Sequence, residues 1–73
     1  MIEELISEHL KILRTGANLS QEKLAEKLGV TRQTINAIER KRKKPSKVQA
    51  IAIYYFIKDS KYTSKILGDA KIE

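Results

Sequence analysis

Polar side chains that can hydrogen-bond to base edges cluster on one face of a short helix predicted over residues 32–40. At about 100° per residue, four of them fall within a common arc: Arg32, Gln33, Asn36 and Arg40. Ile35 and Ile38 point the opposite way and can enter a core. In the DNA major groove, arginine pairs bidentately with guanine, and glutamine or asparagine with adenine. This face therefore predicts base reading, although the same residues could form an ordinary solvated surface.

Basic residues are concentrated at the end of this face. Six of them lie within eight positions: Arg40, Lys41, Arg42, Lys43, Lys44 and Lys47. Residues 1–39 hold five Lys or Arg and six Asp or Glu, a net charge of −1, whereas residues 40–73 hold ten and three, a net charge of +7. Such a run is typical of a protein that binds a polyanion, and its alternative interpretation is a solvated loop. Beside a base-reading face, it predicts contacts to DNA phosphates.

Two short amphipathic helices, over residues 21–28 and 32–40, are predicted to position these side chains. Ser20 and Thr31 precede them and can cap their first turns. The buried stripe expected in the first helix is Leu24, Ala25 and Leu28. Gly29 ends that helix and leaves a short turn before the second. Two capped helices, a tight turn and a basic loop are the layout of a helix-turn-helix, which places one helix in the major groove.

A longer helix is predicted over residues 2–15, ahead of this unit. Its apolar face has intervals of three and four residues: Ile2, Leu5, Ile6, His9, Leu10 and Leu13. Gly16 suits the left-handed position that often follows a helix end. The single histidine, His9, is interpreted as a packed side chain, because no second ligand lies at metal spacing.

The segment over residues 48–57 is apolar almost all round, and its composition permits either a helix or a strand. Ser46 and Gln49 have the spacing of a capping box, which favours a helix. A helix without a polar face is buried on more than one side, so a second copy of the chain is expected to cover it. The predicted dimer surface consists of Ile51, Tyr54, Tyr55 and Ile57.

The whole chain is predicted to form a single domain over residues 1–68, with its helix-turn-helix core at residues 20–40. A short helix is expected over residues 61–67, with Gly68 as its stop. Its inward side chains would be Tyr62, Ile66 and Leu67. Residues 69–73 are expected to form a short frayed tail. A chain of 73 residues allows one small core, and docking of a second copy would stabilise it.

Composition argues against several classes of function. Cysteine is absent, which excludes a disulfide framework, a thiolate nucleophile and a Cys-type metal site. We find no nucleophile–base pair, carboxylate dyad or Gly-rich phosphate loop, so no enzyme activity, cofactor or small-molecule ligand is expected. Residues 2–13 carry Glu3, Glu4 and Glu8, and are therefore neither a signal peptide nor a membrane span.

The stretch over residues 19–46 resembles the helix-turn-helix of the Cro/C1-type regulators, the xenobiotic-response-element family of bacteria, archaea and their phages. The resemblance is carried by LSQEKLAEKLGV, then TRQTINAIER, then a basic loop closed by KPS. It implies an all-α fold, a compact four- to five-helix bundle of the lambda-repressor-like DNA-binding type. It also implies a cytoplasmic, nucleoid-associated homodimer on double-stranded DNA. The apolar and aromatic helix after Ser46 departs from the family pattern, which puts the dimer geometry in doubt.

The resemblance also implies roles for individual residues. Base edges would be contacted by Arg32, Gln33, Asn36 and Ala37, the last of which can only touch a thymine methyl group. Phosphates would be bound by Gln21, Thr31, Arg40, Lys41, Arg42, Lys43 and Lys44. Arg14 and Glu39 match the positions of a structural ion pair that ties the first helix to the third.

The leading hypothesis is a sequence-specific regulator of transcription, a repressor that binds a two-fold operator as a dimer. An alternative from another class is an antitoxin-like interaction protein with autoregulatory DNA binding, in which residues 48–57 would bind the partner. RNA binding is less favoured, because side chains cannot read the major groove of A-form RNA.

Overall fold

Five helices make up the regular structure of residues 2–58, 60 and 62–67, the part of the chain that the computed structural model describes. They are α1 (Ile2–Gly16), α2 (Gln21–Leu28), α3 (Arg32–Glu39), α4 (Lys47–Ile57) and α5 (Thr63–Leu67). No strand occurs among these described residues, so the predicted all-α class is confirmed. The predicted helix start at Lys61, its stop at Gly68 and the tail over residues 69–73 lie outside the described residues.

The segment whose composition permitted a helix or a strand is helical. Its capping box is complete, because Gln49 N–H donates to Ser46 Oγ and Ser46 N–H donates to Gln49 Oε1, both at 3.1 Å. These two bonds satisfy amide groups that a helix start leaves without partners. Ala50, Ile53 and Ile57 are fully buried, and α4 packs against α1 and α2.

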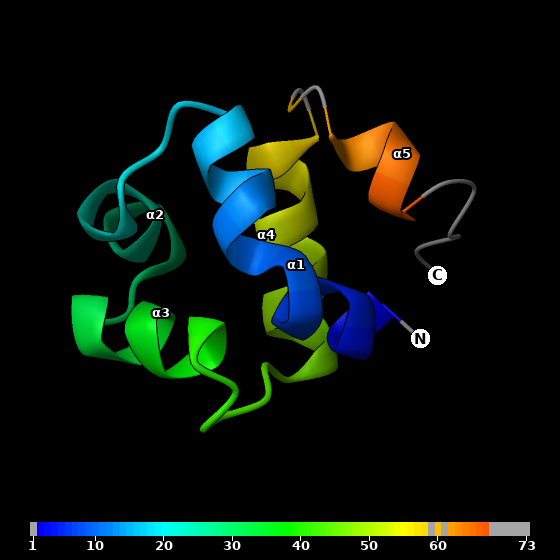
Figure 1. The fold of residues 1–73 in the computed structure, drawn as a ribbon. Helices are drawn as coiled ribbons and strands as arrows, with labels where there is room; N and C mark the ends of the chain where they lie inside the picture. The colour runs from blue at the N-terminus through cyan, green and yellow to red at the C-terminus, as the bar shows by residue number, and fades with distance from the viewer. Residues whose placement is uncertain (1, 59, 61, 68–73) are drawn as a thin grey trace.

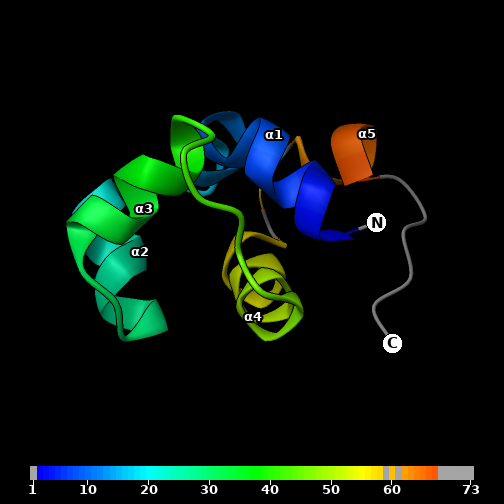
Figure 2. The same ribbon diagram turned by 90° about the horizontal axis from the view of Figure 1, so that it is seen from below.

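The helices surround one core (Figure 1). α1 and α4 pack against each other, α2 and α3 lie together on one side of this pair, and α5 contacts α1 on the other side. The loop that joins α3 to α4 runs from the α2–α3 group back to α4 (Figure 2). The core consists of Ile2, Ile6, Leu10, Leu13, Leu24, Ala25, Ile35, Ile38, Ala50, Ile53 and Ile57. Within the described residues, no helix is long and apolar enough to cross a membrane.

Three of the helices end in the same left-handed turn. Its central residues are Asn18 (φ 62°), Gly29 (φ 76°) and Lys41 (φ 63°). In each turn the next amide reaches back five residues: Leu19 N–H to the Arg14 carbonyl at 3.1 Å, Val30 N–H to Ala25 at 3.0 Å, and Arg42 N–H to Ala37 at 2.9 Å. This is the Schellman motif, in which glycine is the usual central residue and asparagine the next most common. Lys41, after the end of α3, therefore occupies a backbone conformation that lysine rarely adopts.

The prediction that Gly16 takes the left-handed position was wrong, because α1 continues through Gly16 and the turn falls at Asn18. Glycine is needed at position 16 for a different reason. A Cβ there would overlap Ser60 Oγ and would lie 2.7 Å from Tyr62 Cδ2. The absent side chain thus lets Ser60 and Tyr62 lie directly on the end of α1.

The left-handed lysine gives a test of backbone strain. Lys41→Gly is expected to raise the free energy of unfolding by about 0.5–1 kcal/mol, because the steric cost of a Cβ in this conformation exceeds the entropy cost of glycine. Urea denaturation would measure the change. Lys43→Gly is the matched control, since it removes the same charge at a position without positive φ. An unfolding midpoint for Lys41→Gly at or below that of the control would contradict this account.

Candidate nucleic-acid interface

The α2–α3 pair presents α3 as a capped, firmly packed helix. Ser20 Oγ accepts from Lys23 N–H at 3.0 Å at the start of α2. Thr31 Oγ1 accepts from Thr34 N–H at 3.2 Å at the start of α3. Since Ile35 and Ile38 are fully buried, the rotation of α3 about its axis is fixed.

This rotation brings the predicted base-reading residues together on the outer face of α3. Arg32 and Gln33 are exposed, whereas Asn36 and Ala37 are half-buried beside them. Arg40 follows at the end of the helix and is exposed. The face therefore offers guanidinium and carboxamide groups around a small apolar position.

Arg14 and Glu39, the two residues expected to pair, are in contact beneath this face. Arg14 Nε donates to Glu39 Oε2 at 2.6 Å, and Arg14 Nη2 to Glu39 Oε1 at 3.4 Å. Their side chains are only 9% and 6% exposed. Arg14 Nη1 also donates to the Leu19 carbonyl at 2.8 Å. The pair thus joins α1 to α3 and holds the turn before α2.

Gln21 belongs to the same hydrogen-bond network, which the sequence did not reveal. Its Nε2 donates to Glu39 Oε1 at 2.9 Å and to Asn36 Oδ1 at 3.4 Å. Both amide protons are therefore directed at protein acceptors, and the remaining carboxamide oxygen cannot donate to a phosphate. A phosphate contact at this position would fall to the backbone amides at the start of α2.

A hollow of about 400 Å³ adjoins this network, between the first turns of α2 and α3. It is lined by Arg14, Ser20, Gln21, Glu22 and Arg32. Both helix N-termini favour negative charge nearby, and the Arg32 guanidinium adds to this preference. An anionic group in the hollow would be attracted by these features and repelled by the Glu22 carboxylate, which lines the same hollow.

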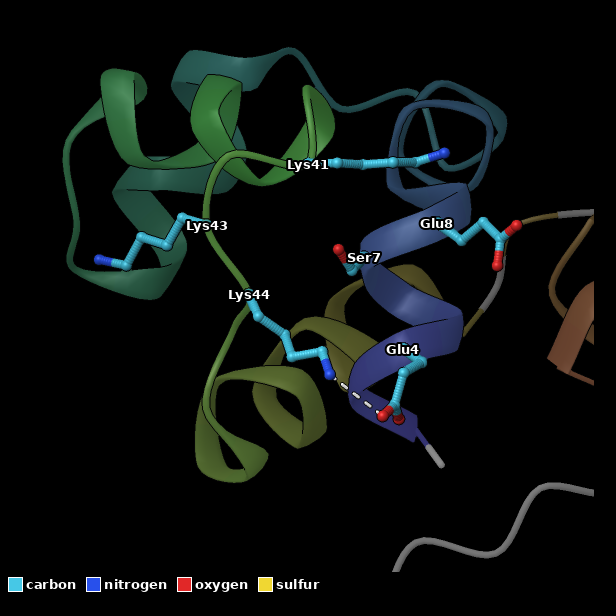
Figure 3. Close-up of a pocket in the computed structure, with 6 residues that line it drawn as sticks. All are labelled: Glu4, Ser7, Glu8, Lys41, Lys43 and Lys44. Carbon is cyan, nitrogen blue, oxygen red and sulfur yellow. Dashed lines mark hydrogen bonds and ion pairs between the residues drawn. The ribbon is translucent and has the colours of Figure 1, made fainter.

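The basic loop, residues 40–46, lies against the N-terminal half of α1. It shares with α1 a pocket of about 340 Å³, lined by Glu4, Ser7, Glu8, Lys41, Lys43 and Lys44 (Figure 3). Lys44 Nζ donates to Glu4 Oε2 at 3.1 Å, whereas Lys43 extends away from α1. Glu4 of α1 thus binds Lys44 of the loop, whereas Lys43 is directed away from α1.

The Lys44–Glu4 contact has an electrostatic consequence. The hydrogen bond from the Lys44 ammonium lowers the pKa of the Glu4 carboxyl below its ordinary value, and a backbone hydrogen bond acts in the same direction. A depressed carboxyl pKa means that the contact is present at neutral pH and is lost as the pH falls through that lowered pKa. Both side chains are more than half exposed, so its effect on stability is small.

The residues expected to form a dimer surface are not all on the surface of α4. Tyr55 is 59% exposed, and Ile51 and Tyr54 are half-buried. Ile57 is fully buried in the protomer core and does not reach this surface. Val48 and Phe56 are 77% and 37% exposed. They are not among the four residues of the predicted dimer surface, although they belong to the segment over residues 48–57 that was expected to bind a partner. A helix that is apolar all round does not show which side faces inward.

The chain is similar in sequence to known helix-turn-helix proteins. A family model described as "Helix-turn-helix" matches residues 10–57, from the second half of α1 to the end of α4. An uncharacterized HTH-type transcriptional regulator of Methanothermobacter thermautotrophicus is 54% identical over 46 residues, which are 63% of this chain and 61% of that protein. A second, of Methanocaldococcus jannaschii, is 53% identical over 47 residues, 64% of this chain and 71% of its own length. The chain thus spans less than two thirds of the first relative, and no solved structure matches it.

The buried ion pair can be tested by removing one charge without changing shape. Glu39→Gln should lower the free energy of unfolding by about 3 kcal/mol, because the buried Arg14 guanidinium loses its counter-charge. Chemical denaturation would measure the loss. Glu26→Gln is the control, since Glu26 pairs with Lys23 at 3.7 Å on the exposed side of α2, and its loss should be below about 0.5 kcal/mol. Similar losses in the two variants would show that the Arg14–Glu39 pair does not hold the helices together.

Proposed function

Because the chain belongs to the Cro/C1-type helix-turn-helix family, whose fold is lambda-repressor-like, we propose that it regulates transcription by binding duplex DNA through α3. The observation that carries the proposal is the outer face of α3. Arg32, Gln33 and Asn36 lie there together, while Ile35 and Ile38 fix the opposite face in the core. Side chains of these polar types read donor and acceptor patterns in the major groove. The two relatives described above carry the name of transcriptional regulators, which supports the same role.

The basic loop would supply most of the affinity that does not depend on sequence. Arg40, Lys41, Arg42, Lys43 and Lys44 are all exposed at the end of α3. The side chains of these residues would contact the DNA phosphates that flank the major groove. Their binding would release counterions from the DNA, which favours association. Such contacts fix the position of α3 on the duplex but carry no sequence information.

We further propose that the chain acts as a dimer on a two-fold operator and represses transcription there. Two copies of α3 would enter successive major grooves about 34 Å apart. The exposed apolar side chains Val48, Tyr55 and Phe56 on α4 support a contact between two copies. Repression would follow from occupancy, since a dimer spanning adjacent half-sites excludes other proteins from that DNA.

Base reading and phosphate binding can be separated by two substitutions. We expect Arg32→Ala to cost about 1–3 kcal/mol on the cognate duplex and to relax the preference at one base pair of each half-site. Lys43→Ala should weaken binding to all duplexes alike and reduce the salt slope by about 1. The cognate duplex would come from selection on random double-stranded DNA, followed by salt titrations. Equal losses on cognate and random DNA for Arg32→Ala would exclude it as a base-reading residue.

The dimer surface has its own test. Tyr55→Lys should raise the Kd of the dimer at least tenfold, about 1.4 kcal/mol, because it replaces an exposed ring with a charge that would face its own copy across the two-fold axis. Sedimentation equilibrium of the full chain would measure this. Ile12→Lys is the control, since Ile12 is a 49% exposed apolar residue of α1 and does not belong to the proposed α4 contact. A dimer that both variants weaken equally, or that neither weakens, would contradict a contact through α4.

A further inference from the structure

We infer that Gln21 sets the base preference of α3 by fixing the orientation of Asn36, so that Asn36 presents only hydrogen-bond donors to the major groove. The inference rests on the proposed function, because it requires α3 to lie against base edges. Gln21 is a positioning residue in this account, since it acts through Asn36 and does not itself contact a base.

The orientation of the Gln21 carboxamide follows from its partner. Gln21 Nε2 lies 2.9 Å from Glu39 Oε1. A carboxylate paired with an arginine can only accept hydrogen bonds, so the group facing it must be a donor. The reversed amide would place an oxygen against an oxygen. Gln21 therefore turns its nitrogen toward Glu39.

The second proton on that nitrogen determines the orientation of Asn36. Asn36 Oδ1 lies 3.4 Å from Gln21 Nε2 and accepts from it. With its oxygen turned toward Gln21, the Asn36 carboxamide directs its Nδ2 to the other side. Asn36 lies in the middle of the outward arc of α3, half-buried. Its outward group is therefore an NH2, which has two donors and no acceptor.

The acceptor that orients Gln21 is itself held by buried hydrogen bonds. Glu39 is held by Arg14 at 2.6 Å, and Arg14 is held in turn by the Leu19 carbonyl at 2.8 Å. The Arg14 and Glu39 side chains are 9% and 6% exposed, so water has little access to compete with these bonds. A rotation of the Asn36 carboxamide would place two amide nitrogens against each other.

A side chain that only donates distinguishes the bases by their acceptors. Guanine presents two acceptors in the major groove, O6 and N7, and thymine presents one. Adenine places a donor beside its acceptor and is favoured by a carboxamide that can offer both a donor and an acceptor. Cytosine presents a donor alone. Asn36 in this network should therefore select guanine, whereas an unconstrained asparagine would select adenine.

The experiment is a selection from random double-stranded DNA with the full chain and three variants. Asn36→Ala identifies the base pair that Asn36 reads, because the preference is lost there. At that base pair the wild type should select guanine. Gln21→Met keeps the length of the side chain but removes the donor, and it should shift the preference toward adenine by about tenfold. Gln33→Met is the matched control, since it should relax a different base pair and leave this one unchanged.

Asn36→Asp gives a second test that does not alter Gln21. Its oxygens would accept from Gln21 and also face the groove, so the preference at the same base pair should change to cytosine, which presents a donor and no acceptor. A purely structural role for Gln21 would lower the affinity for all sequences equally and change no preference. Adenine at the Asn36 base pair in the wild type, or an unchanged preference in Gln21→Met, would overturn the inference. If the wild type enriches no motif at all, the proposed function itself fails.

Discussion

One buried carboxylate, that of Glu39, is the interaction on which the arrangement of the first three helices depends. It belongs to α3, accepts from Arg14 of α1, and accepts from Gln21 at the first position of α2. Arg14 also binds the carbonyl of Leu19, so the turn between α1 and α2 is tied to the same point. Burying a charge is costly unless its hydrogen-bond partners are in place. Arg14 and Gln21 must therefore both be within hydrogen-bond distance of Glu39 when α1, α2 and α3 pack together. These hydrogen bonds to Glu39 determine the direction in which the outer face of α3 points.

Much of this arrangement could be predicted from local rules in the sequence. Ser20, Thr31 and Ser46 cap their helices at the predicted places, because a cap depends only on a few neighbouring residues. The left-handed turn after α1 was predicted at the wrong residue. Glycine is required at position 16 because Ser60 and Tyr62, which are distant in sequence, pack against it. The inward side of α4 could not be predicted either. Its apolar residues lack the helical period, so only packing against α1 and α2 decides that Ile57 is buried and Tyr55 exposed.

The basic loop shows a conflict between local backbone preference and charge. Lys41 occupies a left-handed position that glycine would adopt at lower cost. A lysine there places a cation at the C-terminal end of α3, where the helix dipole favours it, within the run of charge that suits a polyanion. Strained residues of this kind persist where the surrounding structure holds them and are common at functional sites. The hydrogen bonds of the turn hold the conformation, and the side chain lines the same pocket as Glu4 and Glu8 of α1.

The buried hydrogen-bonded group of Arg14, Gln21 and Glu39, here called the charged junction, is better explained by a role in DNA sequence specificity than by a contribution to stability. Apolar side chains of similar volume in place of a buried ion pair often stabilise a protein, because no desolvation has to be offset. In this chain such a replacement would remove the acceptor that turns the nitrogen of Gln21 inward, and Gln21 would no longer orient Asn36. The fold could then remain intact while the outer face of α3 lost its fixed pattern of donors. The charged junction therefore connects the packing of α1 to the chemistry that α3 presents, which an apolar junction of equal stability could not do.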